Sequence, residues 1–583
     1  MALDSALGND DDHISSVDAT TTNMTINESR HNNNVPQHIL HPLSELRRNS
    51  YKSLLQLIPP STQIVLIGEG THGTEEFVRI RSEVTQCLLL QGNGGYTIHH
   101  DDDGGGSIDY HAIVCEGDVQ PFFKLNEFVT MATIPKTTTA AAALLRENGN
   151  TTDNPPTLNN TGIRTMLSQL LSHRFPDWMW SNVPMAEFVY WLQSFNNKND
   201  NSITASNGNE IMQMQTPNVE LPSSMQSNTI TNQPPSKNNK SSSLPPVQLL
   251  GMDIQSPFTS MECIIQELTA MGQEELSTLA NTCYAPLYQF RSSHIRKYGD
   301  AVYGNKVPSQ ESNVKCVLDA LLEKFDDGVA FRELAQTRFE ILEHAHAIVA
   351  SEAYHRQRIY PGHAATWNLR TRAFMDSILR TMDHIRQWKN KVSISKNCEF
   401  NVEEGNNLPV RLIVWAHNSH VGDMRSTGYS SLGQVSLGQL CRETFGEDGV
   451  FVIGMTTHEG EVRAAYADRQ GSCWHGCGEV RTLTKSLDDS HEYALHVAAS
   501  DVGCVRGELA FGMETKRQSE KGTDSKNSGN DCTVSCFDCS RNERFVGSCY
   551  LPQTEMMSHY AMCNLAGQFD YIFHVDVSSA LTI

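Results

Sequence analysis

One stretch decides the fold: residues 64–90 read IVLIGEGTHGTEEFVRIRSEVTQCLLL. Residues 64–68 form a short apolar run, which is typical of a strand buried on both faces of a parallel sheet. Residues 74–90 carry apolar side chains at three- and four-residue spacing, which predicts an amphipathic helix. A glycine-rich turn joins the two. The stretch therefore predicts a strand, a tight turn and a helix, the repeating unit of an α/β fold.

Short apolar runs and longer amphipathic stretches continue to alternate along the chain. Further strands are predicted at residues 111–116, 247–253, 411–417, 450–454, 544–550 and 569–575. Further helices are predicted at residues 184–195, 262–270, 329–354 and 367–388. We expect a mostly parallel central sheet flanked by helices. Because no strand is predicted between about residues 256 and 390, this part is expected to form an inserted helical subdomain.

Several segments hold too few large apolar residues to offset the entropy of ordering them. We predict a disordered leader at residues 1–42, and one folded domain over residues 43–583 that carries disordered inserts. The inserts are predicted at about residues 91–107, 135–162, 196–246 and 516–531.

The composition excludes several classes of function. The 583 residues include 45 Lys plus Arg and 67 Asp plus Glu, a net charge of −22 that would repel nucleic acids and anionic lipids. Neither a signal peptide nor a run of about 18 apolar residues is present. We therefore expect a cytoplasmic protein without nucleic-acid or membrane partners, whose 15 cysteines are reduced thiols.

Ionisable residues follow four of the predicted strands. Because ligands of open parallel sheets bind beyond the carboxyl ends of the strands, these residues are expected to converge. An acidic residue such as Asp253 can equally cap the next helix. The residues are Glu69 and His72 after the first strand, Glu116 and Asp118 after the second, Asp253 after the third, and His417 and His420 after the fourth.

Two histidines with flanking carboxylates serve hydrolysis in two ways. A His that a carboxylate holds in one tautomer can take a proton from water, while an Arg and a second His stabilise the oxyanion or protonate the leaving group. Alternatively, Glu69, His72, Glu116 and His417 bind a divalent metal that lowers the pKa of water. A third interpretation makes the histidines scaffold residues.

Eight blocks of sequence, in order from about residue 43 to the C-terminus, resemble the successive signatures of the erythromycin esterase family. They are residues 68–77 (GEGTHGTEEF), 115–118 (CEGD), 175–180 (FPDWMW), 250–254 (LGMDI), 367–370 (WNLR), 414–423 (VWAHNSHVGD), 437–440 (LGQL), and 558–560 (SHY) followed by 568–570 (QFD).

The resemblance implies an α/β core with a helical portion and hydrolysis of an ester or lactone, which in founding members is the macrolactone of 14-membered macrolides. It implies no serine nucleophile, and the chain contains no G-x-S-x-G. Catalysis is implied for His72 as the base on water, with Glu69, Glu116, Arg81 and His417. We expect Asp118, Asp253, Arg370 and His420 to bind substrate. No cofactor is expected.

One departure concerns substrate recognition. After Arg370 the family usually continues Asp-x-His-Met, whereas this chain has Thr371, Arg372, Ala373 and Phe374. The change affects the expected pocket wall more than the turn of His72. A small-molecule ester or lactone is therefore the expected substrate, and its identity, or the alternative of a catalytically silent binding protein, stays open.

Two other patterns are not predicted to form sites. Cys532, Cys536 and Cys539 have the spacing of iron–sulfur ligands but follow a polar insert, so no metal site is predicted there. Trp178, Trp180 and Trp191 are expected to pack in the core.

Overall fold

The computed structural model describes residues 40–93, 109–131, 160–171, 176–200, 246–293, 295–326, 335–357, 364–395, 409–465, 478–501, 510–515 and 537–583. Nearly all of the predicted leader and inserts, with Cys532 and Cys536, lie outside these ranges. None of the described helices combines the length and the apolar character needed to cross a bilayer.

A mixed sheet forms the centre of the molecule, in the order β1-β8-β11-β6-β2-β5-β3-β4, with β7 paired to β6. The strands from β11 to β4 run parallel, while β1, β7 and β8 pair antiparallel with their neighbours. This confirms the predicted α/β class. The bounds are β1 His41–Pro42, β2 Ile64–Ile67, β3 Ala112–Asp118, β4 Gln248–Asp253, β5 Leu412–Trp415, β6 Val450–Ala464, β7 Glu479–Leu483, β8 Ala510–Glu514 and β11 Tyr571–Ser578.

The central strands are buried on both faces because successive side chains enter two different cores. Val65 and Ile67 of β2 join the core formed with α3 (Glu75–Asn93), α4 (Val119–Thr130), α6 (Asn160–Leu171) and α7 (Val183–Asp200). Ile64 and Leu66 join the core formed with α13 (Ala364–Ser395), α15 (Leu437–Phe445) and α16 (His491–Asp501). This double burial explains why the runs are continuously apolar.

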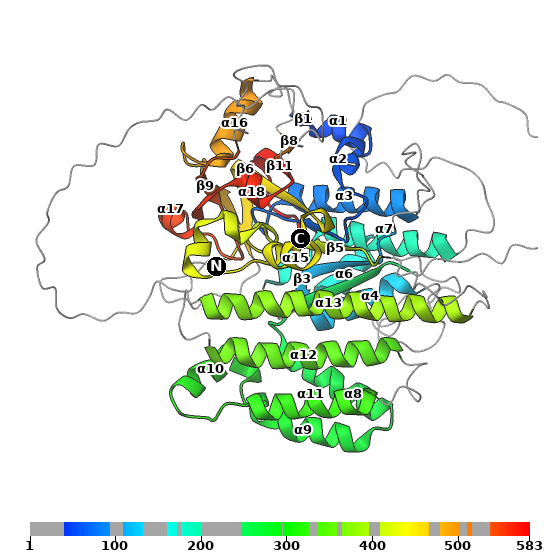
Figure 1. Ribbon diagram of the computed structural model, residues 1–583. Coiled ribbons are helices and arrows are strands. Elements are labelled where there is room, and N and C mark those ends of the chain that lie inside the picture. Colours follow the sequence, from blue (N-terminus) through cyan, green and yellow to red (C-terminus); the bar gives the residue numbers. More distant parts are fainter. Residues whose placement is uncertain are drawn as a thin grey trace, which may run out of the picture.

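Helices α8 to α13 occupy the region that was expected to be helical. Figure 1 shows α13 along the sheet, α12 beyond it and the other four helices farther out. The outer helices share an apolar core of their own, which includes Leu268, Tyr284 and Leu321. The bounds are α8 Pro257–Ala270, α9 Glu274–Tyr288, α10 Arg296–Tyr303, α11 Glu311–Asp326 and α12 Ala335–Gln357.

The prediction of a strand at residues 544–550 is wrong. In its place β9 (Arg541–Arg544) pairs with β10 (Tyr560–Cys563) in a separate two-stranded sheet. Both edges of β2 are already paired, to β5 and β6, so the segment after β9 crosses the turn that follows β2. Val546 donates its N–H to Gly70 O at 2.9 Å and accepts from His72 N–H at 3.1 Å.

Helices α3, α6 and α7 extend a few residues into three predicted inserts, and for α7 a buried polar residue explains the extension. Asn196 belongs to the predicted insert 196–246, but in the structure it is buried in the last turns of α7. Its amide donates to Val129 O at 2.8 Å and to Val247 O at 3.0 Å.

The remaining short helices are α1 Leu43–Arg48, α2 Lys52–Leu57, α14 Asn418–Val421, α17 Glu555–Ser558 and α18 Leu565–Gln568.

Candidate active site

The carboxyl ends of four neighbouring parallel strands meet at one edge of the sheet. In the register of the sheet, Trp415 at the end of β5 pairs with Ile67 of β2 and with Cys115 of β3. The next ionisable residues beyond this level are Glu69, Glu116 and His417, all of them buried. The strand order thus brings together residues that lie far apart in the sequence, as expected.

The turn after β2 carries a carboxylate and imidazole pair. His72 Nδ1 lies 2.9 Å from Glu69 Oε1, and the two side chains are 8% and 1% exposed. Because an ionised carboxylate only accepts hydrogen bonds, Nδ1 carries the proton and donates it to Glu69. The other ring nitrogen, Nε2, then keeps its lone pair. His72 is therefore held in the tautomer that a general base needs.

Arg81 fixes the far side of Glu69. Its Nη1 lies 3.2 Å from Glu69 Oε2, and both side chains are 1% exposed. The guanidinium lies between two indole rings, 5.3 Å from the centroid of Trp180 and 4.8 Å from that of Trp415. These rings keep water from the ion pair and stabilise the cation. The buried carboxylate of Glu69 thus has a buried cation beside it.

Trp178 and Trp180 are buried and Trp191 is partly buried, which confirms their predicted packing. Trp180 also has a role that its spacing did not indicate. Its Nε1 donates to the backbone carbonyl of Glu116 at 3.0 Å, while its ring covers Arg81. A single indole therefore connects the end of β3 to the turn after β2.

Arg370 is the centre of a second buried network. Its Nη2 donates to Glu116 Oε1 at 2.8 Å and to Asp253 Oδ2 at 2.6 Å, and its Nε donates to Asp253 Oδ1 at 3.0 Å. Its Nη1 lies 2.9 Å from His420 Nε2. The residue that caps α8 is Ser256, so Asp253 is not the cap that was considered. It anchors Arg370 instead.

These contacts set the charges of the network. Burial lowers the pKa of His420, which leaves a neutral ring whose Nε2 accepts from Arg370. Burial alone would raise the pKa of Glu116, but the Arg370 guanidinium and the hydrogen bonds from Arg370 and the His417 N–H hold that pKa well below its ordinary value. The pKa of Arg370 is raised by Asp253 and Glu116 against the effect of burial. Two carboxylates thus face one guanidinium.

His420 keeps one polar atom without a partner. Since its Nε2 accepts from Arg370, its Nδ1 carries the proton, and among the described residues this buried atom has no hydrogen-bond acceptor. The ring is stacked on Trp367 with a centroid distance of 4.6 Å and an interplanar angle of 4°. Its orientation is therefore fixed by packing.

His417 joins the two networks. Its backbone N–H donates to Glu116 Oε2 at 2.9 Å, and its ring centroid lies 4.8 Å from that of His72. Ser419 N–H donates to Nδ1 at 3.2 Å, so Nε2 carries the proton and donates to Gly70 O at 3.2 Å. Burial, and then the proximity of His72, lower its pKa well below the ordinary value. Since both nitrogens are occupied, His417 orients the turn.

Asp118, predicted to bind substrate, faces the loop after β4. Its carboxylate accepts from Gln255 N–H at 3.1 Å and from the Ser256 hydroxyl at 2.5 Å. These bonds tie the ends of β3 and β4 together. The hydrogen bonds of Arg370 and His420 described above do not include it.

Asn418 belongs to the site, although the sequence analysis assigned it no role. It is fully buried, and its backbone N–H donates to Glu69 O at 2.8 Å. Its side chain donates to Met455 O at 2.8 Å. A Cβ on Gly68 would lie 2.3 Å from Asn418 Oδ1, so this close approach requires glycine. The sequence signal that could have pointed to this role is the position of Asn418, a polar residue between the two histidines of the 414–423 block.

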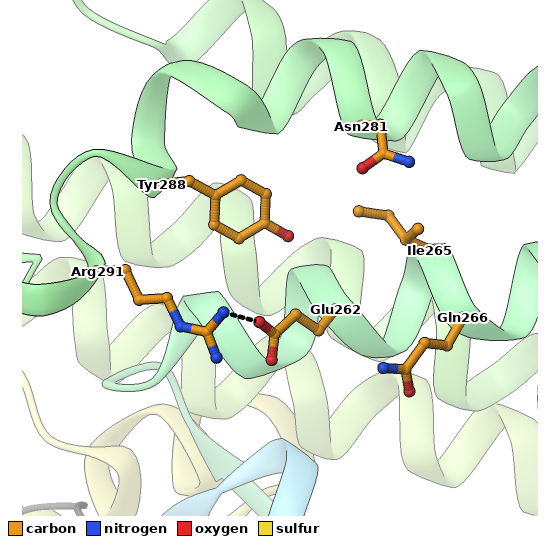
Figure 2. A pocket seen from close by; sticks show the side chains of 6 residues that line it. All are labelled: Glu262, Ile265, Gln266, Asn281, Tyr288 and Arg291. Carbon is orange, nitrogen blue, oxygen red and sulfur yellow. Dashed lines mark ion pairs between the residues drawn. The ribbon is translucent and has the colours of Figure 1, made fainter.

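In the described part of the chain, these residues belong neither to a metal-holding group of side chains nor to the surface hollow found between the outer helices. In the part of the chain that the structure describes, no group of three or more His, Cys, Asp or Glu side chains is arranged to hold a metal ion. Figure 2 shows the side chains around a hollow between helices of the outer layer, with an ion pair between Glu262 and Arg291. The volume of the hollow is about 350 Å³. It is lined by Glu262, Ile265, Gln266, Asn281, Tyr288 and Arg291.

The chain belongs to the erythromycin esterase family, whose model matches residues 108–219 and 235–578. This confirms the resemblance seen in the sequence. The match includes Glu116, Asp253, Arg370 and His417, whereas the turn with Glu69 and His72 precedes it. The family defines a class of hydrolases.

Two solved structures agree with the fold, and a third has a lower TM-score. A protein from Bacillus cereus has a TM-score of 0.54 at 16% identity, covering 94% of this chain and 97% of its own. A structure described as a succinoglycan biosynthesis protein has a TM-score of 0.53 at 16% identity, covering 94% of this chain and 96% of its own. A mutant of the erythromycin esterase EreC, in its open conformation, has a TM-score of 0.47 at 14% identity, with 91% and 94% covered.

Proposed function

We propose that this protein hydrolyses a carboxylic ester or lactone with water that His72 activates. The observation that carries the proposal is the buried pair of Glu69 and His72, in which Nδ1 is bound to the carboxylate and Nε2 retains its lone pair. A neutral imidazole in a fixed tautomer is the usual general base near neutral pH.

The reaction balances without a covalent intermediate. His72 Nε2 takes a proton from water as the water oxygen bonds to the ester carbonyl carbon. Collapse of the tetrahedral intermediate breaks the bond between the carbonyl carbon and the alkoxy oxygen, and the proton passes from His72 to the leaving alkoxide. Glu69 stabilises the transient imidazolium, and Arg81 keeps Glu69 in place.

We assign the developing oxyanion to the N–H of His420 Nδ1. This donor is buried and has no partner among the described residues, and a buried donor without a partner is costly unless a ligand meets it. Arg370, bound to the other ring nitrogen, adds positive charge behind the imidazole. Glu116 and Asp253 hold Arg370 in that position and so act through it.

The segment after Arg370 supports a substrate smaller than a 14-membered macrolide. Phe374 is fully buried with its ring centroid 4.7 Å from the Arg370 guanidinium, and it also contacts the ring of His420. Thr371 is buried beside the same arginine. A bulky ring therefore stands where the family usually has a thioether, and the segment after Arg370 offers fewer polar groups than the family pattern.

The test is turnover by the purified protein on a panel of aryl esters, lactones and macrolides, with His72→Asn in parallel. Hydrolysis by the wild type that the variant lacks would support the proposal. Absence of hydrolysis across the panel, or an equal rate in the variant, would contradict it and favour a binding protein. A small-molecule partner and a cytoplasmic location remain predictions.

A further inference from the structure

The sequence block 558–560 has no task in the mechanism above, although it contains a buried histidine. His559 directly follows α17 and is 1% exposed, and its N–H donates to Glu555 O at 2.8 Å. The next residue, Tyr560, begins β10 and pairs with Arg544, the last residue of β9. His559 therefore lies beside the point where the chain leaves β9.

His559 makes three hydrogen bonds with the backbone of the segment that follows β9. Phe545 N–H donates to His559 O at 2.7 Å, and His559 Nδ1 lies 3.1 Å from Phe545 O. Leu551 N–H donates to His559 Nε2 at 3.0 Å. Because a backbone N–H can only donate and a carbonyl can only accept, Nε2 is the acceptor and Nδ1 carries the proton. The imidazole thus binds both ends of the segment 545–551.

The neutral ring is the form that these bonds require. A second proton, on Nε2, would take away the acceptor of Leu551 N–H. Burial lowers the pKa of His559 to about 4, in agreement with a neutral ring at ordinary pH. The tautomer itself follows from the two backbone partners.

The bound segment continues directly into the turn of the general base. Val546, the neighbour of Phe545, donates its N–H to Gly70 O at 2.9 Å and accepts from His72 N–H at 3.1 Å. The ring of Phe545 lies 6.1 Å from the ring of His417, measured between centroids. A displacement of Phe545 would therefore move the groups that hold the backbone of His72.

We propose that His559 is a positioning residue for the hydrolysis: by binding both backbone polar groups of Phe545 it fixes Val546, and through Val546 it fixes His72. The inference rests on the proposed function, because it concerns the alignment of the same base. A base displaced by about 1 Å can lose about 10²-fold in rate, so a distant hydrogen bond is sufficient to affect turnover.

A purely structural role for His559 has a different consequence. If the residue only stabilised the small sheet of β9 and β10, its loss would lower the free energy of unfolding and leave kcat of the folded protein unchanged. A positioning role lowers kcat at temperatures where the variant is fully folded, and leaves KM nearly unchanged.

Two conservative variants separate the two bonds of the ring. His559→Asn keeps an amide N–H in the place of Nδ1–H and so can bind Phe545 O, whereas His559→Gln keeps an acceptor for Leu551 N–H and loses the bond to Phe545. For the best ester of the panel, we expect His559→Gln to lower kcat about 10²-fold with KM changed by at most about twofold. His559→Asn should keep kcat within about threefold of the wild type. Wild-type kcat in His559→Gln, or equal losses in the two variants, would overturn the proposal.

His111→Gln is the matched control. His111 is also buried and its Nδ1 also accepts a backbone N–H, that of Arg411 at 3.3 Å. It directly precedes β3, at the edge of the sheet opposite to the candidate active site. This variant should lose stability and keep kcat. A loss of kcat as large as that of His559→Gln would show a general effect of removing a buried imidazole, and the proposal would fail.

A second measurement does not depend on hydrolysis. Hydrogen exchange of the His72 and Val546 amides, which bind each other's segments, should be at least about tenfold faster in His559→Gln than in the wild type. Exchange within β2 should stay unchanged. If exchange at the two amides is unaffected, the proposal is wrong even when the enzyme is active. If exchange increases but His72→Asn keeps full turnover, the link between His559 and the turn stands, while the base assignment fails and with it the positioning role.

Discussion

Glu116 accepts a hydrogen bond from the backbone N–H of His417 at 2.9 Å, although 301 positions separate them in the sequence. Its other oxygen binds Arg370 at 2.8 Å. One carboxylate therefore fixes both the turn after β5 and the guanidinium behind His420. The His417 ring in turn contacts the ring of His72. Contacts through Glu116 and His417 therefore connect Arg370 to the general base.

Replacing His72 by Asn should lower kcat by about 10²- to 10⁴-fold, because general-base assistance typically contributes that much. The fold should persist, since the glycines of the turn and the backbone bonds to Val546 remain. Steady-state kinetics and circular dichroism measure the two effects. The same substitution at His496 of α16, outside both networks, is the control and should leave kcat unchanged. Near-normal kcat in His72→Asn would remove this residue from the mechanism.

Replacing Arg370 by Met should destabilise the protein by about 3–5 kcal/mol, because Glu116 and Asp253 would remain buried without their cation. The free energy of unfolding in urea measures this loss. Arg425→Met is the matched control: its side chain is 48% exposed and its ion pair should be worth at most about 1 kcal/mol. Equal losses in the two variants would show that the buried network contributes no special stability.

Acid should destabilise the wild type more than Glu116→Gln. The folded-state pKa of Glu116 lies well below the ordinary value of 4.5, so its ionised form stabilises the fold above pH 4.5. That contribution is lost as the pH falls from 4.5 toward the lower folded-state pKa. Unfolding free energies at about pH 7 and about pH 4 test the difference. Glu479→Gln, at a side chain that is 69% exposed, should retain the wild-type pH dependence.

Prolonged chelation should leave turnover unchanged, because the pair of Glu69 and His72 performs proton transfer with its own groups. Activity before and after chelation, with metal analysis of the purified protein, measures this. Stoichiometric zinc or manganese, together with activity that is lost on chelation and restored by that metal, would establish the metal-dependent alternative.

Erythromycin should be a poorer substrate than a small aryl ester, by at least about tenfold in kcat/KM. Each polar contact missing from the segment after Arg370 is expected to cost roughly 1–3 kcal/mol in macrolide recognition. The triple change Thr371→Asp, Ala373→His and Phe374→Met restores the family pattern. It should bring kcat/KM for erythromycin closer to kcat/KM for the small aryl ester. Efficient opening of erythromycin with little turnover of small esters would place these residues outside the substrate pocket.

Local sequence patterns determined much of the fold. The apolar run of β2, the glycine turn and the periodicity of α3 each depend on neighbours within a few residues, so each could be predicted. The same holds for the ionisable residues at strand ends, since parallel strands place their carboxyl ends at one edge. The short antiparallel strands β1, β7 and β8 were missed, because their pairing depends on partners distant in sequence.

Only the tertiary structure decided how the site residues divide their tasks. The sequence could not say which ring nitrogen carries the proton in His72, His417 and His420, whereas the structure fixes each tautomer through a partner: Glu69, Ser419 and Arg370, respectively. The proton lies on Nδ1 in His72 and His420 and on Nε2 in His417. Asn418 and Trp180 entered the site for the same reason. A hydrogen bond or a buried charge depends on groups brought together from separate strands and helices, and no local pattern records which groups those are.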